Sequence, residues 1–181
     1  MSVPQMPKPA KLVVGLFLGE KGLIAPAARD LLDAFGPMDM ISSWFGFDFT
    51  SYYEREMGRP LFRRLFSFQE LIGQDRLPTI KRATNDMEDR YRKNGRRQVN
   101  IDPGYMVHSR FVLATGKDYA HRIYMGDGIY ADLTLTYQQG RFRTLPWTYP
   151  DYAAKEMRDY LSRIRNKYVD DLKRGPQSDA G

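Results

Sequence analysis

The stretch AKLVVGLFLG, residues Ala10–Gly19, decides the fold that we expect for this chain. It is a nearly continuous run of apolar side chains and lacks the alternation of a half-exposed strand. Such a run, ended by glycine, is typical of a strand that is buried on both faces. We therefore expect this segment to lie in the centre of a sheet.

A helix is predicted directly after this strand, over residues 24–35. Pro26 suits its first turn, and Gly36 followed by Pro37 is a common way to end a helix. Its apolar positions recur at helical spacing on one face. Those positions are Ile24, Ala28, Leu31, Leu32 and Phe35.

Two further helices are predicted from the same periodicity. The first covers Pro78–Lys93 and is ended by Asn94 and Gly95. The second covers Tyr152–Leu172, with Asp151 as its N-cap. Their apolar stripes are Leu77, Ile80, Thr84, Met87 and Tyr91 in the first, and Ala153, Met157, Tyr160, Leu161, Ile164 and Tyr168 in the second.

The remaining ordered segments alternate between apolar and polar residues or end in turn residues, as strands do. A helix remains an alternative for residues 52–57 and 63–71. A turn is expected at Asp102-Pro103-Gly104, and a hairpin around Gly126-Asp127-Gly128. The expected strands are Met40–Phe49, Leu61–Phe68, Gln98–Ile101, Tyr105–Ala114, Ala120–Met125, Ile129–Tyr137 and Arg141–Leu145.

This order of elements predicts an α+β fold with a ferredoxin-like βαββαβ core, a β-hairpin extension and a C-terminal helix. At 181 residues the chain fits one domain. We expect that single α+β domain to cover residues 1–172, with residues 173–181 as a disordered polar tail.

Composition narrows the functional classes. The chain has no cysteine, which excludes disulfides and thiolate metal sites and fits a cytoplasmic location. No apolar run is long enough to span a membrane, and the N-terminus lacks the apolar region of a signal peptide. The formal net charge of +6 favours anionic partners, although lysine and arginine are spread along the chain. The oligomeric state is left open.

Several known motifs are absent. Gly15 and Gly19 invite comparison with a phosphate-binding loop, but Glu20 stands before Lys21 and no hydroxyl residue follows. A serine-hydrolase elbow is missing as well. Two histidines and no cysteine leave only carboxylate-rich sites for hard cations, so we predict no metal site and assign no cofactor.

The densest polar cluster is Lys117, Asp118, His121 and Arg122. Histidine is the default acid–base group near neutral pH, and the two cations suit an anionic ligand. If the segment is a strand, Asp118 and Arg122 share one face while Lys117 and His121 share the other. A packed or surface histidine with locally paired charges is the alternative interpretation.

Three other groups of residues are candidates. Asn100 and Asp102 point to the same face of their expected strand, although Asp102 also suits an Asx-type turn. The group Trp147, Tyr149, Asp151 and Tyr152 lies in a segment stiffened by prolines, and its aromatic residues suit the wall of a pocket or the cover of a sheet edge. The third group, in which carboxylates alternate with tyrosines, contains Asp48, Tyr52, Tyr53, Glu54 and Glu56. A solvated turn is the alternative for that group.

Taken together, several strings resemble the prokaryotic domain-of-unknown-function family 4416, over nearly the whole chain to about residue 172. They are Phe47-Asp48-Phe49-Thr50, Tyr52-Tyr53-Glu54, Glu56-Met57-Gly58, Asn100-Ile101-Asp102-Pro103-Gly104-Tyr105, Lys117-Asp118-Tyr119-Ala120-His121-Arg122-Ile123-Tyr124 and Leu145-Pro146-Trp147-Thr148-Tyr149-Pro150-Asp151-Tyr152. The resemblance implies no established activity. A GTP-binding label on some members has no phosphate-binding loop to support it here. Because these strings recur as a set, we expect the candidate groups to converge on one cleft.

The sequence therefore predicts an aromatic-lined, basic-flanked cleft for a small anionic ligand, with a nucleotide such as GTP as one possibility. Whether the protein is an enzyme is left open. The predicted acid–base residues are Asp102 and His121. The predicted ligand-binding residues are Asp48, Tyr53, Glu54, Arg64, Asn100, Lys117, Asp118, Arg122, Tyr130, Trp147 and Tyr149. The alternative function is an RNA-binding module that uses the basic surface and sheet aromatics, and a third is an interaction module whose aromatics are structural.

Overall fold

The computed structural model describes residues 1–46, 57 and 60–174 of the chain. Within them, one large sheet is combined with four α-helices and a small separate hairpin. The strands are β1 (Ala10–Leu18), β2 (Met38–Ile41), β3 (Phe45–Gly46), β4 (Phe62–Ile72), β5 (Arg92–Lys93), β6 (Arg96–Arg97), β7 (Val99–Val107), β8 (Arg110–Thr115), β9 (Arg122–Gly126), β10 (Ile129–Gln138) and β11 (Arg141–Thr144). The helices are α1 (Ile24–Phe35), α3 (Leu77–Arg90), α4 (Pro150–Ala153) and α5 (Lys155–Arg174), with single 3₁₀ turns at Lys21–Leu23 and Gln74–Arg76.

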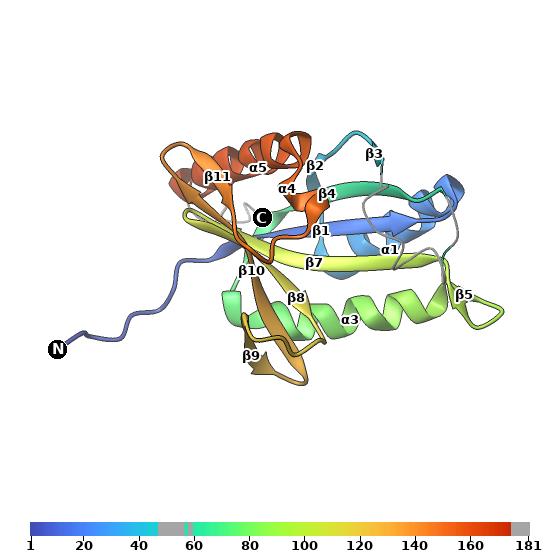
Figure 1. The fold of residues 1–181 in the computed structure, drawn as a ribbon, viewed down its shortest axis with the longest axis horizontal. Helices are drawn as coiled ribbons and strands as arrows, with labels where there is room; N and C mark the ends of the chain where they lie inside the picture. Colours follow the sequence, from blue (N-terminus) through green and yellow to red (C-terminus); the bar gives the residue numbers. More distant parts are fainter. Residues whose placement is uncertain (47–56, 58–59, 175–181) are drawn as a thin grey trace, which may run out of the picture.

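Strand β1 is the centre of the molecule, which confirms the prediction made from Ala10–Gly19. All nine of its residues are buried, and it pairs with β4 on one side and with β7 on the other. Helices α1 and α3 cover the sheet face that carries Leu12 and Leu16. Helix α5 covers the opposite face, which carries Val13. The protein is thus a three-layer structure in which helices lie on both faces of the sheet (Figure 1).

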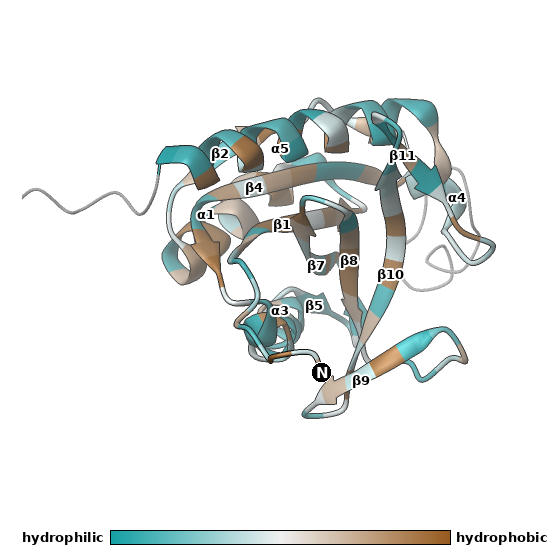
Figure 2. Ribbon diagram, turned by 90° about the vertical axis from the view of Figure 1, so that its left-hand side faces the viewer, coloured by the Kyte–Doolittle hydropathy of each residue, from teal (hydrophilic) through white to brown (hydrophobic). Residues whose placement is uncertain are grey.

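The sheet is larger than the sequence predicted. Its strand order is β11-β10-β8-β7-β1-β4-β2, β3 adds to β4, β9 adds to β10, and the pairings are antiparallel. The predicted hairpin is present as β9 and β10. It is not a separate unit, because β10 also pairs with β8 and so belongs to the large sheet. Figure 2 shows β10 running from β11, near α5, down to the projecting β9 hairpin. The α+β class is confirmed, and the helix alternative for residues 63–71 is wrong because this segment lies within β4.

Strand β7 corrects the predicted turn at Asp102-Pro103-Gly104. The strand continues through Pro103 to Val107, and the turn that leads into β8 lies at His108 and Ser109. Proline is tolerated here because β8 pairs with β7 only from Gly104 onward, so no ladder bond needs the missing N–H. A side chain at Gly104 would collide with the carbonyl oxygen of Val112, so glycine permits this close pairing.

The end of α3 differs from the prediction as well. The helix ends at Arg90, and β5 and β6 form a two-stranded hairpin around Asn94 and Gly95. Both turn residues have positive φ, 53° and 75°, as Asn-Gly hairpin turns require. The Asn-Gly pair therefore makes a hairpin turn, and the helix has already ended before it.

The C-terminal helix is interrupted near its start. Asp151 does not cap it but lies inside the short α4, and the extended backbone of Ala154 (ψ 140°) separates α4 from α5. The predicted apolar stripe is otherwise confirmed, since Met157, Leu161 and Ile164 pack in the core under α5. Helix α5 continues to Arg174, past the expected limit of 172, and residues 175–181 lie outside the described part. None of the helices in the described residues is both long enough and apolar enough to cross a membrane.

Candidate functional site

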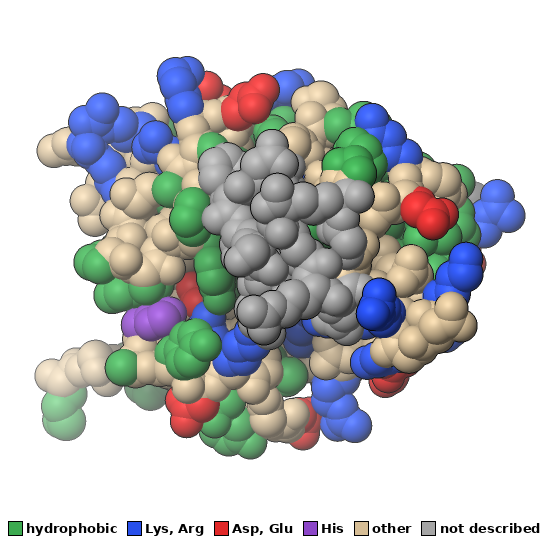
Figure 3. Space-filling model, turned by 45° about the vertical axis from the view of Figure 1, so that its right-hand side comes forward, with side chains coloured by type: hydrophobic (Ala, Val, Ile, Leu, Met, Phe, Trp, Pro, Cys, Tyr) green, Lys and Arg blue, Asp and Glu red, His purple; other side chains and the backbone are tan. Residues whose placement is uncertain are grey.

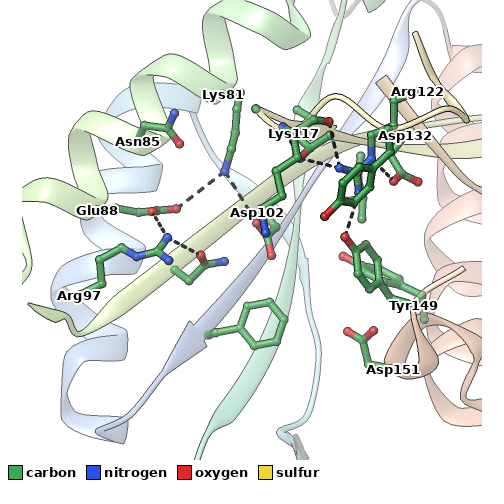
Figure 4. Close-up of a pocket in the computed structure, with 18 of the residues that line it drawn as sticks. Lys81, Asn85, Glu88, Arg97, Asp102, Lys117, Arg122, Asp132, Tyr149 and Asp151 are labelled. Atoms are coloured by element: carbon green, nitrogen blue, oxygen red, sulfur yellow. Dashed lines mark hydrogen bonds and ion pairs between the residues drawn. The ribbon is translucent and has the colours of Figure 1, made fainter. Parts of the chain in front are cut away.

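A cavity of about 690 Å³ opens where β8 diverges from β7. The first half of β7 has no strand partner on this side, so α3, the end of β8 and the segment before α5 enclose the space. Figure 4 shows side chains from these elements pointing toward one another across it. The residues that line it are Phe17, Lys81, Asn85, Glu88, Arg97, Asn100, Asp102, Leu113, Ala114, Thr115, Gly116, Lys117, Tyr119, Arg122, Asp132, Tyr149, Pro150, Asp151 and Tyr152.

Two side chains of α3 replace the missing strand partner of β7. Glu88 Oε1 accepts a hydrogen bond from the Ile101 backbone N–H at 2.7 Å, and Lys81 Nζ donates to the Ile101 carbonyl at 2.8 Å. Both side chains are buried, so the backbone N–H and C=O of Ile101 are satisfied within the protein although no strand pairs with them. Burial raises the pKa of Glu88, and the nearby charge of Lys81 opposes that rise. The carboxylate thus depends on its cations to remain ionised.

Arg97 closes the same wall from the β6 side. Its Nη1 donates to Glu88 Oε2 at 3.1 Å and to Asn100 Oδ1 at 3.0 Å. These bonds use the oxygen of Asn100, and its Nδ2 has no hydrogen-bond partner although it is buried. Asp102, two residues along the same face of β7, lies 3.7 Å from Lys81 Nζ.

Arg122 joins the other walls of the cavity. Its Nε donates to Asp132 Oδ2 at 2.9 Å, its Nη1 to the Lys117 carbonyl at 3.0 Å and its Nη2 to the Tyr149 hydroxyl at 2.9 Å. The guanidinium also lies 4.3 Å from the ring centre of Tyr119. Arg122 is 6% exposed, and these bonds fix the loop before β9 against β10 and the segment before α4. Its main role in the geometry is to shape the cavity.

His121 lies beside this group of contacts, which we call the Arg122 clamp. Its Nε2 is 3.3 Å from Asp132 Oδ2, and its ring stacks on Trp147 with centres 4.9 Å apart. Trp147 Nε1 in turn donates to the Leu133 carbonyl at 2.8 Å. Neither ring lines the cavity, so the pair supports the wall through Asp132.

Behind the floor lies a second buried arginine, Arg63, which the sequence did not single out; it does not line the cavity but contacts three residues that do, Phe17, Asp151 and Tyr152. The Arg63 guanidinium lies between the rings of Phe17 and Tyr152, with its central carbon 4.5 Å and 4.1 Å from their centres. Its Nη1 donates to Asp151, while its Nε and Nη2 have no hydrogen-bond partner. The Tyr152 hydroxyl has no partner of ordinary hydrogen-bond geometry either. Burial raises the pKa of Tyr152 to about 12, and Arg63 opposes this rise.

The structure brings part of the predicted site together. The predicted residues that line the cavity are Asn100, Asp102, Lys117, Arg122 and Tyr149. His121 and Trp147 lie in the next layer. The sequence predicted that strand alternation would put Lys117 and Arg122 on opposite faces. Residues 117–121 form a loop instead, and both side chains line the cavity.

Other predicted residues lie elsewhere. Arg64 is on the opposite face of β4 from Arg63, where its Nε donates to the Ser42 carbonyl and its guanidinium lies over Trp44. Tyr130 packs on Tyr124 in the projecting hairpin, and Asp118 does not line the cavity. The residues Asp48, Tyr53 and Glu54 lie outside the described part of the chain.

Sequence reasoning missed Lys81, Glu88, Asp132 and Arg63. A signal existed for the first two, because they lie seven residues apart on the same side of α3 as its apolar stripe. For Arg63, alternation puts it on the same strand face as Leu61 and Leu65, which indicated an inward-facing charge. Nothing local marks Asp132, since its partner Arg122 comes into contact only when the hairpin forms.

The charges of the lining residues balance. Lys81, Arg97, Lys117 and Arg122 are cations, and Glu88, Asp102, Asp132 and Asp151 are carboxylates. Glu88, Asp132 and Asp151 are each buried and each contact at least one basic group. Among the described residues, no three histidine, aspartate or glutamate side chains are grouped so as to hold a metal ion.

A family model described as "Domain of unknown function (DUF4416)" matches residues 8–168. No curated protein and no solved structure matches the chain. The matched range includes all the described strands and every residue that lines the cavity, and it ends within α5. The chain therefore belongs to the DUF4416 family.

Proposed function

We propose that the cavity between β7 and β8 binds a small anionic ligand. The observation that carries this proposal is the cavity itself, which has a volume of about 690 Å³ and convergent polar groups on several walls. Ligand pockets of small molecules usually measure about 300–1,000 Å³. Tyr119, Tyr149 and Phe17 add aromatic surface to the lining, as such pockets commonly have.

The distribution of charge favours an anion at the mouth. The buried carboxylates of Glu88 and Asp132 already contact arginine side chains, so they add little unpaired negative charge. Lys117 is exposed, and Arg97 is partly exposed at the rim. An anion that reaches the mouth would therefore meet positive charge first.

Nucleotides and phosphorylated sugars belong to the class of ligand that this cavity suits. Their rings match the aromatic lining, and their phosphates match the cations at the mouth. The chain has no phosphate-binding loop, so recognition would depend on side chains of the cavity. Asp102 lies on the floor and remains the acid–base candidate with direct access to a bound ligand, but we propose no reaction.

A thermal-shift screen tests this function. Nucleotides and phosphorylated metabolites should raise the melting temperature, because a ligand that binds only the native state stabilises it. The Lys117→Gln variant should lose affinity for the ligand that is found, and its binding should depend less on salt. Lys155→Gln, at an exposed position on α5, is the matched control and should bind like the wild type. A complete absence of stabilisation across the panel, or equal binding by both variants, would contradict the proposal.

The RNA-binding alternative has lost the feature on which it rested. Helices cover both faces of the sheet, and aromatic residues of its central strands such as Phe17 and Phe66 are buried. On the face shown in Figure 3, lysine and arginine side chains of the described residues form several separate groups, without one continuous basic patch. Because the aromatic residues of the central strands are covered, we do not propose RNA as the partner.

Two finer expectations belong to the same proposal. We infer that β1, α1, β2, β4, α3 and β7 form a ferredoxin-like core, and the strand order β7-β1-β4-β2 supports this inference. We also infer a cytoplasmic location, which the absence of cysteine supports.

A further inference from the structure

Two residues that line the floor of the cavity, Tyr152 and Asn100, have polar hydrogens without an ordinary hydrogen-bond partner, and Arg63 lies directly behind them. A Cβ atom added at Gly15 would lie 3.2 Å from Arg63 Nη2 and 3.5 Å from the Tyr152 hydroxyl oxygen, so both groups adjoin the same point of the sheet. Asn100 Nδ2, on the neighbouring strand, has no partner either. Arg63, Tyr152 and Asn100 are 0%, 2% and 3% exposed. Because an unsatisfied buried donor is costly, an acceptor atom from a ligand would be strongly favoured here.

The charges at this floor do not favour a second anion. Asp151 already binds Arg63 and neutralises its charge. Asp102 is paired across the sheet with Gly15, so its carboxylate is on the same face as these donors. A negatively charged group at the floor would therefore be close to the carboxylates of Asp102 and Asp151. The two nearby cations, Lys81 and Arg63, are already paired with those carboxylates, so they would not attract a second anion strongly.

Asp102 provides what the donors lack, which is an acceptor. Its side chain is 24% exposed and lies 3.7 Å from Lys81, so a ligand donor could still reach it. The Tyr152 hydroxyl carries its proton at neutral pH and is a donor, since the ordinary pKa of tyrosine is already well above 7 and burial raises the pKa of Tyr152 further. Donors and an acceptor are thus presented side by side on one face of the sheet.

We propose that this floor recognises an uncharged group of the ligand that carries an acceptor oxygen beside an N–H or O–H donor. The acceptor oxygen is bound by Tyr152 and Asn100, and the donor is bound by Asp102. The –CO–NH– edge of a heterocyclic ring and two neighbouring sugar hydroxyls both have this chemistry. The inference rests on the proposed function in one respect, which is that the ligand's anion lies at the mouth, so the ligand is oriented with its uncharged end inward.

NMR titration with three small probes tests this orientation. The probes are 2-pyridone, which has a –CO–NH– edge, ribose, which has neighbouring hydroxyls, and inorganic phosphate. The signals to follow are the side-chain amide of Asn100 at the floor and the backbone amide of Lys117 at the mouth. We expect 2-pyridone or ribose to shift the Asn100 signal, and phosphate to shift the Lys117 signal alone. Binding of 2-pyridone would indicate that the group is a heterocyclic –CO–NH– edge, and binding of ribose would indicate a pair of sugar hydroxyls.

The Asp102→Asn variant distinguishes a floor that binds an uncharged group from one that binds an oxyanion, because the two predict opposite changes in affinity. For an uncharged probe, loss of the charged acceptor should weaken binding by about 10-fold. If the floor instead bound oxyanions, removing this negative charge would strengthen phosphate binding there. The Asp86→Asn variant, at an exposed position of α3 outside the cavity, is the matched control and should change neither affinity.

The Tyr152→Phe variant keeps the test independent of folding. It removes a hydroxyl that has no partner of ordinary hydrogen-bond geometry and only adjoins Arg63, so the protein should fold normally and bind the uncharged probe more weakly. A phosphate-induced shift of Asn100 that grows stronger in Asp102→Asn would overturn the proposal, as would the failure of both uncharged probes to shift Asn100. A response of Asn100 to an uncharged probe without any response of Lys117 to phosphate would leave the floor proposal standing and contradict the anion at the mouth.

Discussion

Two buried basic residues lie on the same face of the sheet, near opposite ends of the C-terminal helical segment, and they differ in how many of their donors are used. Lys11 Nζ lies 2.6 Å from Asp39 Oδ2, 2.6 Å from the Phe68 carbonyl and 2.8 Å from Asp171 Oδ2. Arg63 contacts Asp151 through Nη1, and its Nε and Nη2 have no partner. We call the first group of residues the Lys11 cluster, and we keep the name cavity floor for Tyr152, Asn100 and Asp102, which line the cavity in front of Arg63.

The difference between the two regions separates a structural role from a binding role. An ammonium group has three donors, and three oxygens surround that of Lys11. A buried charge that is fully surrounded ties elements together, and here it joins β1, β2 and α5. A buried group with unused donors retains the capacity to bind something else. The cavity adjoins the second region, as this distinction requires.

Removing the cation of the Lys11 cluster should have the largest effect on stability. The Lys11→Met variant leaves the carboxylates of Asp39 and Asp171 in a buried place with only Lys167 nearby. Losing one partner of a buried ion pair typically costs about 3–5 kcal/mol. Urea unfolding should show this loss, whereas Lys8→Met, at an exposed position, should stay within about 0.5 kcal/mol of the wild type. Equal stability of the two variants would show that the cluster does not hold the fold.

Removing one hydroxyl from each region should sharpen the comparison. Ser67 Oγ donates to Asp39 Oδ1 at 2.5 Å, so Ser67→Ala should cost about 1.5–3 kcal/mol, as for other hydrogen bonds to charged groups. Tyr152→Phe removes a hydroxyl that has no partner of ordinary hydrogen-bond geometry and should leave the stability of the ligand-free protein nearly unchanged. Thermal unfolding of both variants measures this contrast. A loss in Tyr152→Phe as large as that in Ser67→Ala would mean that the floor is satisfied and not open.

The smallest expected effect is on the response to acid. Burial alone would raise the pKa of Asp39, but hydrogen bonds from Lys11 and Ser67 outweigh it and hold the pKa below its usual value of 3.8. Because the folded-state pKa is the lower one, Asp39 contributes stability above pH 3.8 that is lost as the pH falls through the folded value. The unfolding free energy of Asp39→Asn should therefore fall less steeply than that of the wild type below about pH 4. If the unfolding free energies of the wild type and of Asp39→Asn fell in parallel below about pH 4, the pKa of Asp39 would not be lowered in the folded protein.

Most of the fold could be predicted because its signals are local. The apolar run of β1 and the periodicity of α1 and α5 each reflect burial of one segment, which the sequence shows directly. The turn at Pro103 was mispredicted because proline normally interrupts a ladder, and whether a strand has a partner at that point depends on β8. Long-range pairing of this kind leaves no mark on the residues concerned.

The candidate site was predictable only in part for the same reason. Asn100 and Asp102 share a strand face, which alternation predicted. The contacts of Arg122 with Asp132 and of Lys81 with the backbone of Ile101 depend on how distant elements are placed. The clamp and the α3 wall therefore required the structure.

Titration calorimetry with the ligand from the screen gives the most direct test of the claim that the cavity is the binding site. Asn85 is exposed on α3 and lines the cavity, so Asn85→Trp should block it without disturbing the core (Figure 4). Asp86 is the next residue, is equally exposed and does not line the cavity, which makes Asp86→Trp the matched control. The account predicts that the ligand binds the wild type and Asp86→Trp with the same affinity and fails to bind Asn85→Trp. Undiminished binding by Asn85→Trp would place the ligand elsewhere and contradict the account.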